Sequence, residues 1–295
     1  MMSRIGQPPV ITRGIQCNVR RSYYPVIYET DTLQFIGEDK PDPTNFFETF
    51  DDCGIFPELM ANLERLEITQ PSALQKATMY LATQRRYHHR NMLIRSDRRG
   101  KLLSLLIPVI ACIYEWKIKR GFQPEPRRPL ALIMVPITPL LNELEVLLTE
   151  LLRDTPITFA CTTMASDETQ VRTDLRRGVH ILIGIPLCVR NLSLPRRSLP
   201  AHELDAIPDL DFSDVEWTIM SHCDVMYMGR FPGPSLARII EGVRSKSVIY
   251  VTCQQPDEGP ESVALNTVRQ TIVNDNARTP THLEIVAYDW PPTSP

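Results

Sequence analysis

The stretch that decides the fold class reads Asn91-Met-Leu-Ile-Arg-Ser-Asp-Arg-Arg-Gly-Lys-Leu-Leu-Ser-Leu-Leu-Ile-Pro-Val-Ile110. A short apolar run over 91–95 leads into a polar loop that contains Gly100, and a longer apolar run follows over 102–114. The first run has the length of a buried strand, and the second has the length of a helix. The stretch therefore predicts a strand, a loop and a helix in that order.

The same alternation continues along the chain. Further short apolar runs lie at 131–135, 157–160, 180–183, 217–220 and 247–251. Helical patterns cover 140–152 and 166–177, and two earlier helices are expected, one around Leu59, Leu63 and Leu66 and one from Pro71 to Tyr80. Apolar strands separated by helices are typical of a parallel sheet that is buried on both faces. We predict an α/β fold with a single doubly wound parallel sheet flanked by helices.

One folded unit is expected to span residues 46–286. Residues 1–45 are rich in Pro, Arg and Tyr and show no sustained period, so we predict a loosely ordered N-terminal extension. Residues 192–211 carry three prolines and are predicted to form an inserted surface loop. Residues 287–295 are predicted to be a C-terminal tail.

Composition excludes several classes of protein. Hydrophobic residues make up 43% and charged residues 23% of the 295 residues, which is ordinary for a globular protein. The longest apolar stretch, 102–114, is shorter than the roughly 20 residues of a membrane helix. The N-terminus has no apolar run behind its arginines, so no secretory signal is expected. These features predict an intracellular protein that has no membrane partner.

Charge and cysteine usage narrow the choice further. The formal net charge of −3 argues against a surface that binds nucleic acid all over, and a local basic patch stays open. The seven cysteines include no C-x-x-C pair, which indicates neither a disulfide framework nor a common zinc site. A metal at the neighbouring His222 and Cys223 is disfavoured because no other ligand cluster has a suitable spacing. We expect no metal and no cofactor, and nothing indicates a DNA partner.

Several segments, taken in order, resemble the motifs of the DEAD-box RNA helicases. The loop 95–103 and the helix after it resemble the phosphate loop A-x-T-G-x-G-K-T, and 69–75 resembles the Q motif, with Phe50 at the place of its isolated aromatic residue. Downstream, 135–140 resembles A-P-T-R-E-L, 184–188 the T-P-G-R region, 221–224 D-E-A-D and 251–253 S-A-T. The segments 36–41 and 50–55 are similar to the Vasa subfamily. The resemblance covers residues 36–286 and implies the N-terminal RecA-like lobe of that family.

The residues that would perform ATP hydrolysis differ from the family pattern. Gly100 and Lys101 remain in the phosphate loop, but Arg98 stands at a glycine position and Leu102 at the position of the threonine that helps hold magnesium. In the D-E-A-D motif, Ser221 and His222 stand where the resemblance implies a magnesium-binding aspartate and the glutamate that positions water. Asp224 keeps the last acidic position. We predict that the ATPase is inactive and that no residue is catalytic.

The remnants of the nucleotide site have two interpretations each. The resemblance implies that Phe50 and Gln75 cover and recognise adenine, and the alternative is that Phe50 packs in the core and Gln75 caps a loop. Lys101 can be an ordinary lysine at a helix start, and Asp224 can be retained for structure. A residual nucleotide-binding switch therefore stays open as an alternative function.

RNA contacts in the family come from loops after later strands, and these loops have changed as well. Thr138 and Pro139 replace Arg and Glu, and Leu187 and Cys188 replace Gly and Arg, so weak RNA binding is expected. A basic stretch could bind RNA in a new way or serve as an anchor for an acidic partner. Its arginines are Arg85, Arg86, Arg90, Arg95, Arg98 and Arg99.

The expected function follows from these losses. The resemblance implies that unwinding needs a second lobe, and the chain stops near the interlobe linker, so closure-driven unwinding is not expected of this sequence. We expect a catalytically inactive interaction module or adapter in RNA metabolism, whose partners are proteins of a ribonucleoprotein or silencing complex. The Vasa resemblance suggests the germline, a cytoplasmic or perinuclear ribonucleoprotein granule, or small-RNA silencing, with the nucleus as an alternative location.

Overall fold

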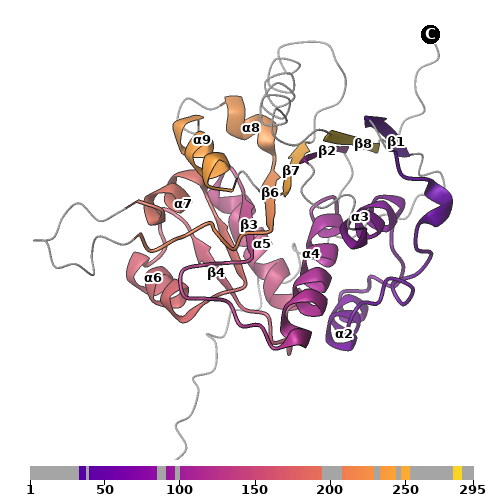
Figure 1. The fold of residues 1–295 in the computed structure, drawn as a ribbon, viewed down its shortest axis with the longest axis horizontal. Helices are drawn as coiled ribbons and strands as arrows, with labels where there is room; N and C mark the ends of the chain where they lie inside the picture. The colour runs from indigo at the N-terminus through magenta and orange to yellow at the C-terminus, as the bar shows by residue number, and fades with distance from the viewer. Residues whose placement is uncertain are drawn as a thin grey trace, which may run out of the picture.

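A computed structural model of the chain describes residues 33–37, 40–84, 91–96, 100–194, 208–228, 233–243, 247–252 and 282–287. In this part of the chain, eight strands form one sheet with the order β1-β8-β2-β7-β6-β3-β5-β4 (Figure 1). The strands are β1 (Leu33–Gly37), β2 (Asn91–Ser96), β3 (Ala131–Met134), β4 (Phe159–Thr162), β5 (Ile181–Gly184), β6 (Trp217–Ser221), β7 (Ser247–Thr252) and β8 (His282–Ala287). Strands β2 to β8 pair in parallel, and β1 pairs with β8 antiparallel. The predicted α/β parallel sheet is confirmed.

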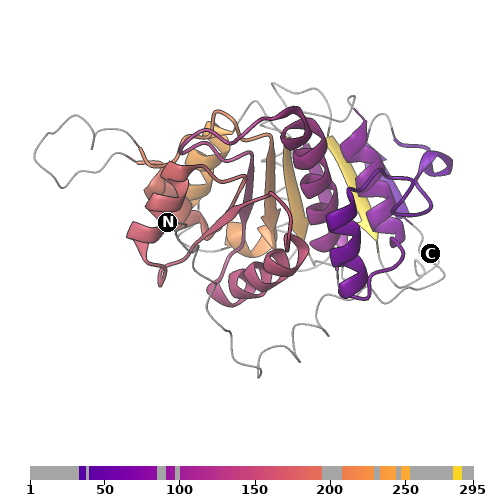
Figure 2. The ribbon, with the colours of Figure 1, turned by 90° about the horizontal axis from the view of Figure 1, so that it is seen from below.

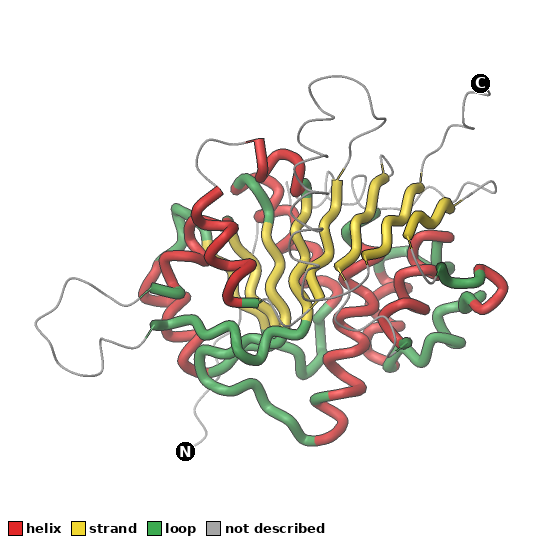
Figure 3. Tube along the Cα trace, turned by 45° about the horizontal axis from the view of Figure 1, so that its top comes forward, coloured by secondary structure: helices red, strands yellow, loops and turns green. Residues whose placement is uncertain are grey.

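Helices cover both faces of this sheet (Figures 2 and 3). They are α2 (Pro57–Arg65), α3 (Ala73–Thr83), α4 (Leu103–Trp116), α5 (Thr138–Leu151), α6 (Glu168–Arg177), α7 (Pro186–Leu192), α8 (Cys223–Met228) and α9 (Gly233–Gly242), with short 3-10 turns at Pro43–Asn45 and Ile118–Arg120. Among the described helices, none combines the length and apolar character that a membrane crossing requires.

Alternation along the strands builds two cores. In β3, Ile133 faces the core formed with α2, α3, α4 and α5, whereas Leu132 and Met134 face the core formed with α6, α7, α8 and α9. All four residues of β3 are buried, and so are all four of β5. A strand that is buried on both faces must be apolar along its whole length, which is why these strands read as continuous hydrophobic runs.

The N-terminal boundary of the fold needs a correction. Residues 33–37 belong to the segment predicted to be loosely ordered, yet they form the edge strand β1. Leu33 and Phe35 are half-buried against the first core, while Gln34 and Ile36 are exposed, as in an edge strand with one covered face. Residues 1–32 and the predicted tail beyond Ala287 lie outside the described residues. The folded part therefore begins before residue 46.

The helix expected to start at Pro71 also begins later. Ser72 is the N-cap of α3, and its Oγ accepts a hydrogen bond from the backbone N–H of Gln75 at 3.3 Å. The side-chain Oε1 of Gln75 accepts in return from the backbone N–H of Ser72 at 2.8 Å. This reciprocal capping box satisfies two donors at the helix start, so Pro71 precedes the helix and does not form its first turn.

The predicted surface loop at 192–211 is anchored at both ends. Leu192 and Leu210 are buried, and the backbone N–H of Leu210 donates to the carbonyl of Leu192 at 3.0 Å. Residues 195–207 lie outside the described residues. The prediction of a surface loop is therefore wrong for the two ends, because their apolar side chains pack into the second core.

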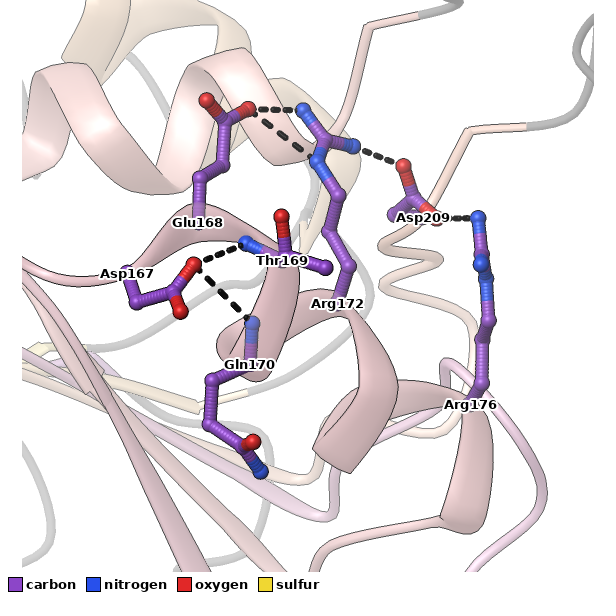
Figure 4. Close-up of polar contacts among 7 residues, drawn as sticks. All are labelled: Asp167, Glu168, Thr169, Gln170, Arg172, Arg176 and Asp209. Atoms are coloured by element: carbon purple, nitrogen blue, oxygen red, sulfur yellow. Dashed lines mark hydrogen bonds and ion pairs between the residues drawn. The ribbon is translucent and has the colours of Figure 1, made fainter.

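A buried carboxylate fixes the returning end of this segment (Figure 4). Asp209 is 2% exposed and forms ion pairs with Arg172 and Arg176 of α6; the Arg176 Nη2 to Asp209 Oδ1 distance is 2.9 Å. Arg172 also pairs with Glu168, one turn earlier in the same helix. A buried charge is tolerated only when it is paired, so this contact holds 208–211 against α6.

We expect Asp209→Asn to lower the free energy of unfolding by about 2 to 4 kcal/mol, because it removes the buried one of the two carboxylates that pair with Arg172. Asp211→Asn is the matched control. Asp211 pairs with Arg128 at 2.9 Å, but both side chains are more than 40% exposed, so a loss below about 1 kcal/mol is expected. Urea denaturation followed by circular dichroism measures the free energy of unfolding of both variants. Equal decreases in the two variants would contradict this role of Asp209.

Candidate functional site

The parallel topology brings the candidate site together at one edge of the sheet. Strands β2, β7 and β6 are neighbours, so the loops that leave the carboxyl ends of β2 and β6 lie close to each other. The first loop carries Gly100, Lys101 and Leu102 into α4, and the second carries 221–224 into α8. The charge of Lys101 affects the pKa of His222, which places the two side chains in one electrostatic environment.

The described part of the loop before α4 consists of residues 100–102; it contains one cationic side chain, Lys101, and no hydroxyl group. Gly100 has φ +85°, a left-handed conformation that favours glycine. Lys101 is half-buried, and its carbonyl accepts a hydrogen bond from Ser104 Oγ at 2.6 Å. Leu102 is the N-cap of α4 and makes no side-chain cap. Arg98 and Arg99 lie outside the described residues.

The turn after β6 is tightly packed and polar. Ser221 is buried at the strand end, and its Oγ lies 2.9 Å from Nδ1 of His222. His222 has φ +55°, an unusual conformation for a residue other than glycine. Asp224 is buried, and its Oδ1 has no hydrogen-bond partner. The turn therefore holds one carboxylate and one imidazole.

The environment keeps His222 neutral. Burial lowers the pKa of His222, the positive charge of Lys101 lowers it further, and the negative charges of Asp224 and Glu143 act in the opposite direction. Because the ordinary pKa of histidine is about 6.5, the imidazole is uncharged at pH 7. It can accept or donate a hydrogen bond, and it contributes no charge to balance a phosphate or a metal.

These residues do not fit a magnesium site. Magnesium prefers carboxylate and other hard oxygen ligands in octahedral geometry. Asp224 is the one carboxylate in the turn 221–224, Ser221 Oγ already contacts His222, and Leu102 is apolar. Within the described ranges, no group of three or more His, Cys, Asp and Glu side chains is arranged to hold a metal ion.

The two residues of the predicted adenine site have structural roles. Phe50 is buried in the first core with Ile55 and Leu59. Gln75 is buried and caps α3 through its Oε1, while its Nε2 has no hydrogen-bond partner. The capping role and the packing role are the alternatives that the sequence left open. Adenine recognition by these two residues stays a prediction.

Arg95 does not belong to the predicted basic patch. It lies in β2, where all six residues are buried, and its Nη1 donates to Oε1 of Glu284 on β8 at 3.0 Å. Both side chains are buried, because the two parallel strands are neighbours inside the sheet. The other arginines of that patch lie outside the described residues; they are Arg85, Arg86, Arg90, Arg98 and Arg99.

The loops at the other half of the same edge carry apolar side chains. Thr138 and Pro139 begin α5, and Leu187 and Cys188 lie in the first turn of α7. Sequence reasoning identified these four positions as losses of RNA contacts, but it missed Met164, which follows β4 and is 71% exposed. The exposure of Met164 depends on the side chains that surround it in three dimensions, and the local sequence carries no signal that predicts them.

Comparisons with known proteins find relatives among RNA helicases. No family model matches the chain. The ATP-dependent rRNA helicase RRP3 of Meyerozyma guilliermondii is 21% identical over 206 residues, which cover 70% of this chain and 38% of that protein. The yeast DEAD-box splicing factor Prp28 has a TM-score of 0.63 at 15% identity, over 86% of this chain and 54% of that one. Dbp5 of S. cerevisiae, bound to RNA and ADP BeF3, has a TM-score of 0.58 at 18% identity, over 77% and 50%. These likenesses confirm the predicted RecA-like fold, and the chain spans about half the length of the solved relatives and 38% of RRP3.

Two substitutions should move the pKa of His222 in opposite directions. Lys101→Gln removes a positive charge that disfavours the imidazolium ion, so the pKa should rise. Asp224→Asn removes a negative charge that favours it, so the pKa should fall. Histidine NMR signals followed against pH report both. The control is Lys119→Gln, because Lys119 is exposed and paired with Glu115; this variant should leave the pKa of His222 unchanged. If the pKa of His222 is the same in all three variants as in the wild-type chain, the proximity of Lys101 and His222 is contradicted.

Proposed function

Because its RecA-like region is homologous to DEAD-box RNA helicases, we propose that this chain is a catalytically inactive relative that acts as a protein-interaction module or adapter in RNA metabolism. The observation that carries the proposal is the turn 221–224. It has Ser221 and His222 where the helicase motif would place two carboxylates, and it keeps only Asp224.

Phosphoryl transfer from ATP requires a metal ion that balances charge on the phosphates and a group that positions the attacking water. Ser221 contributes a neutral hydroxyl that is already in contact with His222, and Leu102 contributes no oxygen ligand. His222 is a neutral imidazole close to Lys101, so it could act as a base. With Asp224 as the one carboxylate of the turn and no second acidic ligand there, a metal ion is held too weakly to activate a phosphate for such a base.

The fold does not need the lost chemistry. The two cores consist mainly of apolar side chains from the strands and helices; from the candidate site, Cys223 packs in the second core and Leu102 against the first, whereas Ser221, His222 and Asp224 belong to neither. Loops can therefore change while the sheet persists, which is how a scaffold is retained after its activity is lost. Inactivity is thus compatible with a stable domain that presents surfaces to other proteins.

A second candidate function is nucleotide binding without hydrolysis. It is favoured by two buried polar atoms that have no hydrogen-bond partner, Gln75 Nε2 and Asp224 Oδ1. Such atoms are costly to leave unsatisfied, and a bound ligand can satisfy them after a local rearrangement. RNA binding through the basic patch is a weaker candidate, because Arg95 is committed to Glu284.

The finer assignments remain predictions of the sequence. These are the Vasa-like ancestry, the germline or ribonucleoprotein-granule location, and a role with the proteins of a silencing complex. RRP3 is described as an ATP-dependent rRNA helicase and Prp28 as a splicing factor. The described functions of these relatives support RNA metabolism as the setting for this chain.

Thermal unfolding with and without magnesium and 5 mM ATP, together with phosphate release in the presence of RNA, tests the proposal. We expect a cooperative transition whose midpoint is unchanged, and no phosphate release. A midpoint rise of about 5 °C or more, as expected at 100-fold saturation of a binding site, would favour the second candidate. If phosphate release occurs, Lys101→Ala identifies its source: activity that this variant loses belongs to the chain and contradicts the proposal, whereas a contaminating ATPase is unaffected.

A further inference from the structure

Large apolar side chains are exposed at one edge of the sheet. In the described part of the chain, five large hydrophobic side chains are exposed. Ile137 follows β3, Leu187 follows β5 and Met164 follows β4, with exposed fractions of 49%, 38% and 71%. We call these three residues the apolar edge. The other two are Val225 in α8 and Ile36 in β1; β1 lies at the opposite end of the sheet order.

The sheet brings the apolar edge together. Strands β3, β5 and β4 are consecutive in the sheet, and Met134, Gly184 and Thr162 are in register at their carboxyl ends. Neighbouring strands lie about 4.8 Å apart, so the three loops leave the sheet within about 10 Å of one another. Cys188 Sγ lies 3.5 Å from Met164 Sδ, which joins the first turn of α7 to the loop after β4.

A glycine fixes the support beneath these side chains. A Cβ at Gly184 would lie 2.5 Å from Cγ2 of Thr162 and 2.8 Å from Cγ2 of Val189. Any larger residue would therefore push α7 away from β4, since such distances are far inside van der Waals contact. The close approach packs the start of α7, which carries Leu187, next to the end of β4, which leads to Met164.

The charged residues beside the apolar edge are mainly acidic, and Arg190 of α7, three residues after Leu187, is the exception among those of α5, α7 and the start of α6. The residues that follow β3, β4 and β5, at 135–139, 163–167 and 185–188, include no Lys, Arg or His, and Asp167 is their one charged residue. Asp167 caps α6 through the backbone N–H groups of Thr169 and Gln170, and Glu168 follows it (Figure 4). Glu143 and Glu145 of α5 are exposed as well. The exposed carboxylates favour cationic groups, and the exposed apolar side chains favour apolar groups.

On the basis of the proposed function, we propose that the apolar edge is the docking surface for an amphipathic, basic segment of a partner protein. Apolar side chains of the segment would contact Ile137, Met164 and Leu187, and its lysines or arginines would face Asp167 and the glutamates of α5. Methionine suits such a surface because its flexible thioether adapts to different partners. The inference names the partner class and the face that the adapter uses.

The test uses a fluorescently labelled 18-residue helix of leucine and lysine as the probe and measures its binding by fluorescence anisotropy. We expect the wild-type chain to bind it, and Ile137→Ser/Met164→Ser to weaken binding by about tenfold or more, as for the central residues of an interface. Ile36→Ser is the matched control, because Ile36 is 45% exposed on β1, the strand at the opposite end of the sheet order. This variant should bind the peptide with unchanged affinity. Because all substituted side chains are exposed, the variants should fold as the wild-type chain does. An unchanged melting temperature of each variant checks this.

Several results would overturn the inference. They are the absence of binding to the wild-type chain, equal binding by the double variant, and equal binding of a leucine and glutamate helix. Loss of single-stranded RNA binding in the double variant, with the peptide unaffected, would assign the edge to RNA. Self-association that disappears in the double variant would assign it to a second copy of the chain. Each of these can occur while ATP is neither bound nor hydrolysed, so failure of the docking surface is distinguishable from failure of the proposed inactivity.

Discussion

Burial of the sheet on both faces is the constraint on which the rest of the molecule depends. In β3, Ile133 and Leu132 are both fully buried, one in each core. Each such side chain contributes about 1.5 to 3 kcal/mol when it leaves water, and both can be buried only if helices cover the two faces. Parallel strands joined by covering helices then bring the loops that follow these strands to the same edge of the sheet, and the loops that lead from helices into strands to the opposite edge. The position of the candidate site is a consequence of core formation.

This arrangement separates stability from chemistry. The strands and helices are held by apolar contacts, whereas the polar residues Ser221, His222 and Asp224 of the turn after β6 belong to neither core. At the turn after β6, His222 adopts a left-handed conformation and contacts Ser221, yet β6 on the one side and α8 on the other keep their buried residues. Substitution can alter the charge of the turn without altering its place in space. A surface that once suited one ligand can thereby come to suit another.

The sequence predicted those elements whose signal is local. Continuous apolar runs identify β3, β5 and β6 because both faces of each strand are buried. The edge strand β1 escaped prediction because its pattern alternates and its stability comes from pairing with β8, at the other end of the described chain. Arg95 was misjudged for a related reason, since its partner Glu284 is 189 residues away. The motif residues could be placed at one edge from topology alone, whereas the exposure of Met164 depends on its three-dimensional neighbours.

The backbone contact between Leu192 and Leu210 has a consequence for how this domain can vary. The contact joins two chain segments that are also anchored separately, one by the buried end of α7 and the other by the ion pairs of Asp209 with Arg172 and Arg176 of α6. Because the ends are already held together, adding residues between them costs only the slowly growing entropy of a longer closed loop, about 0.6 kcal/mol per doubling. The segment between Leu192 and Leu210 is therefore a site that tolerates insertions. Its length and composition can differ between relatives without a change in either core.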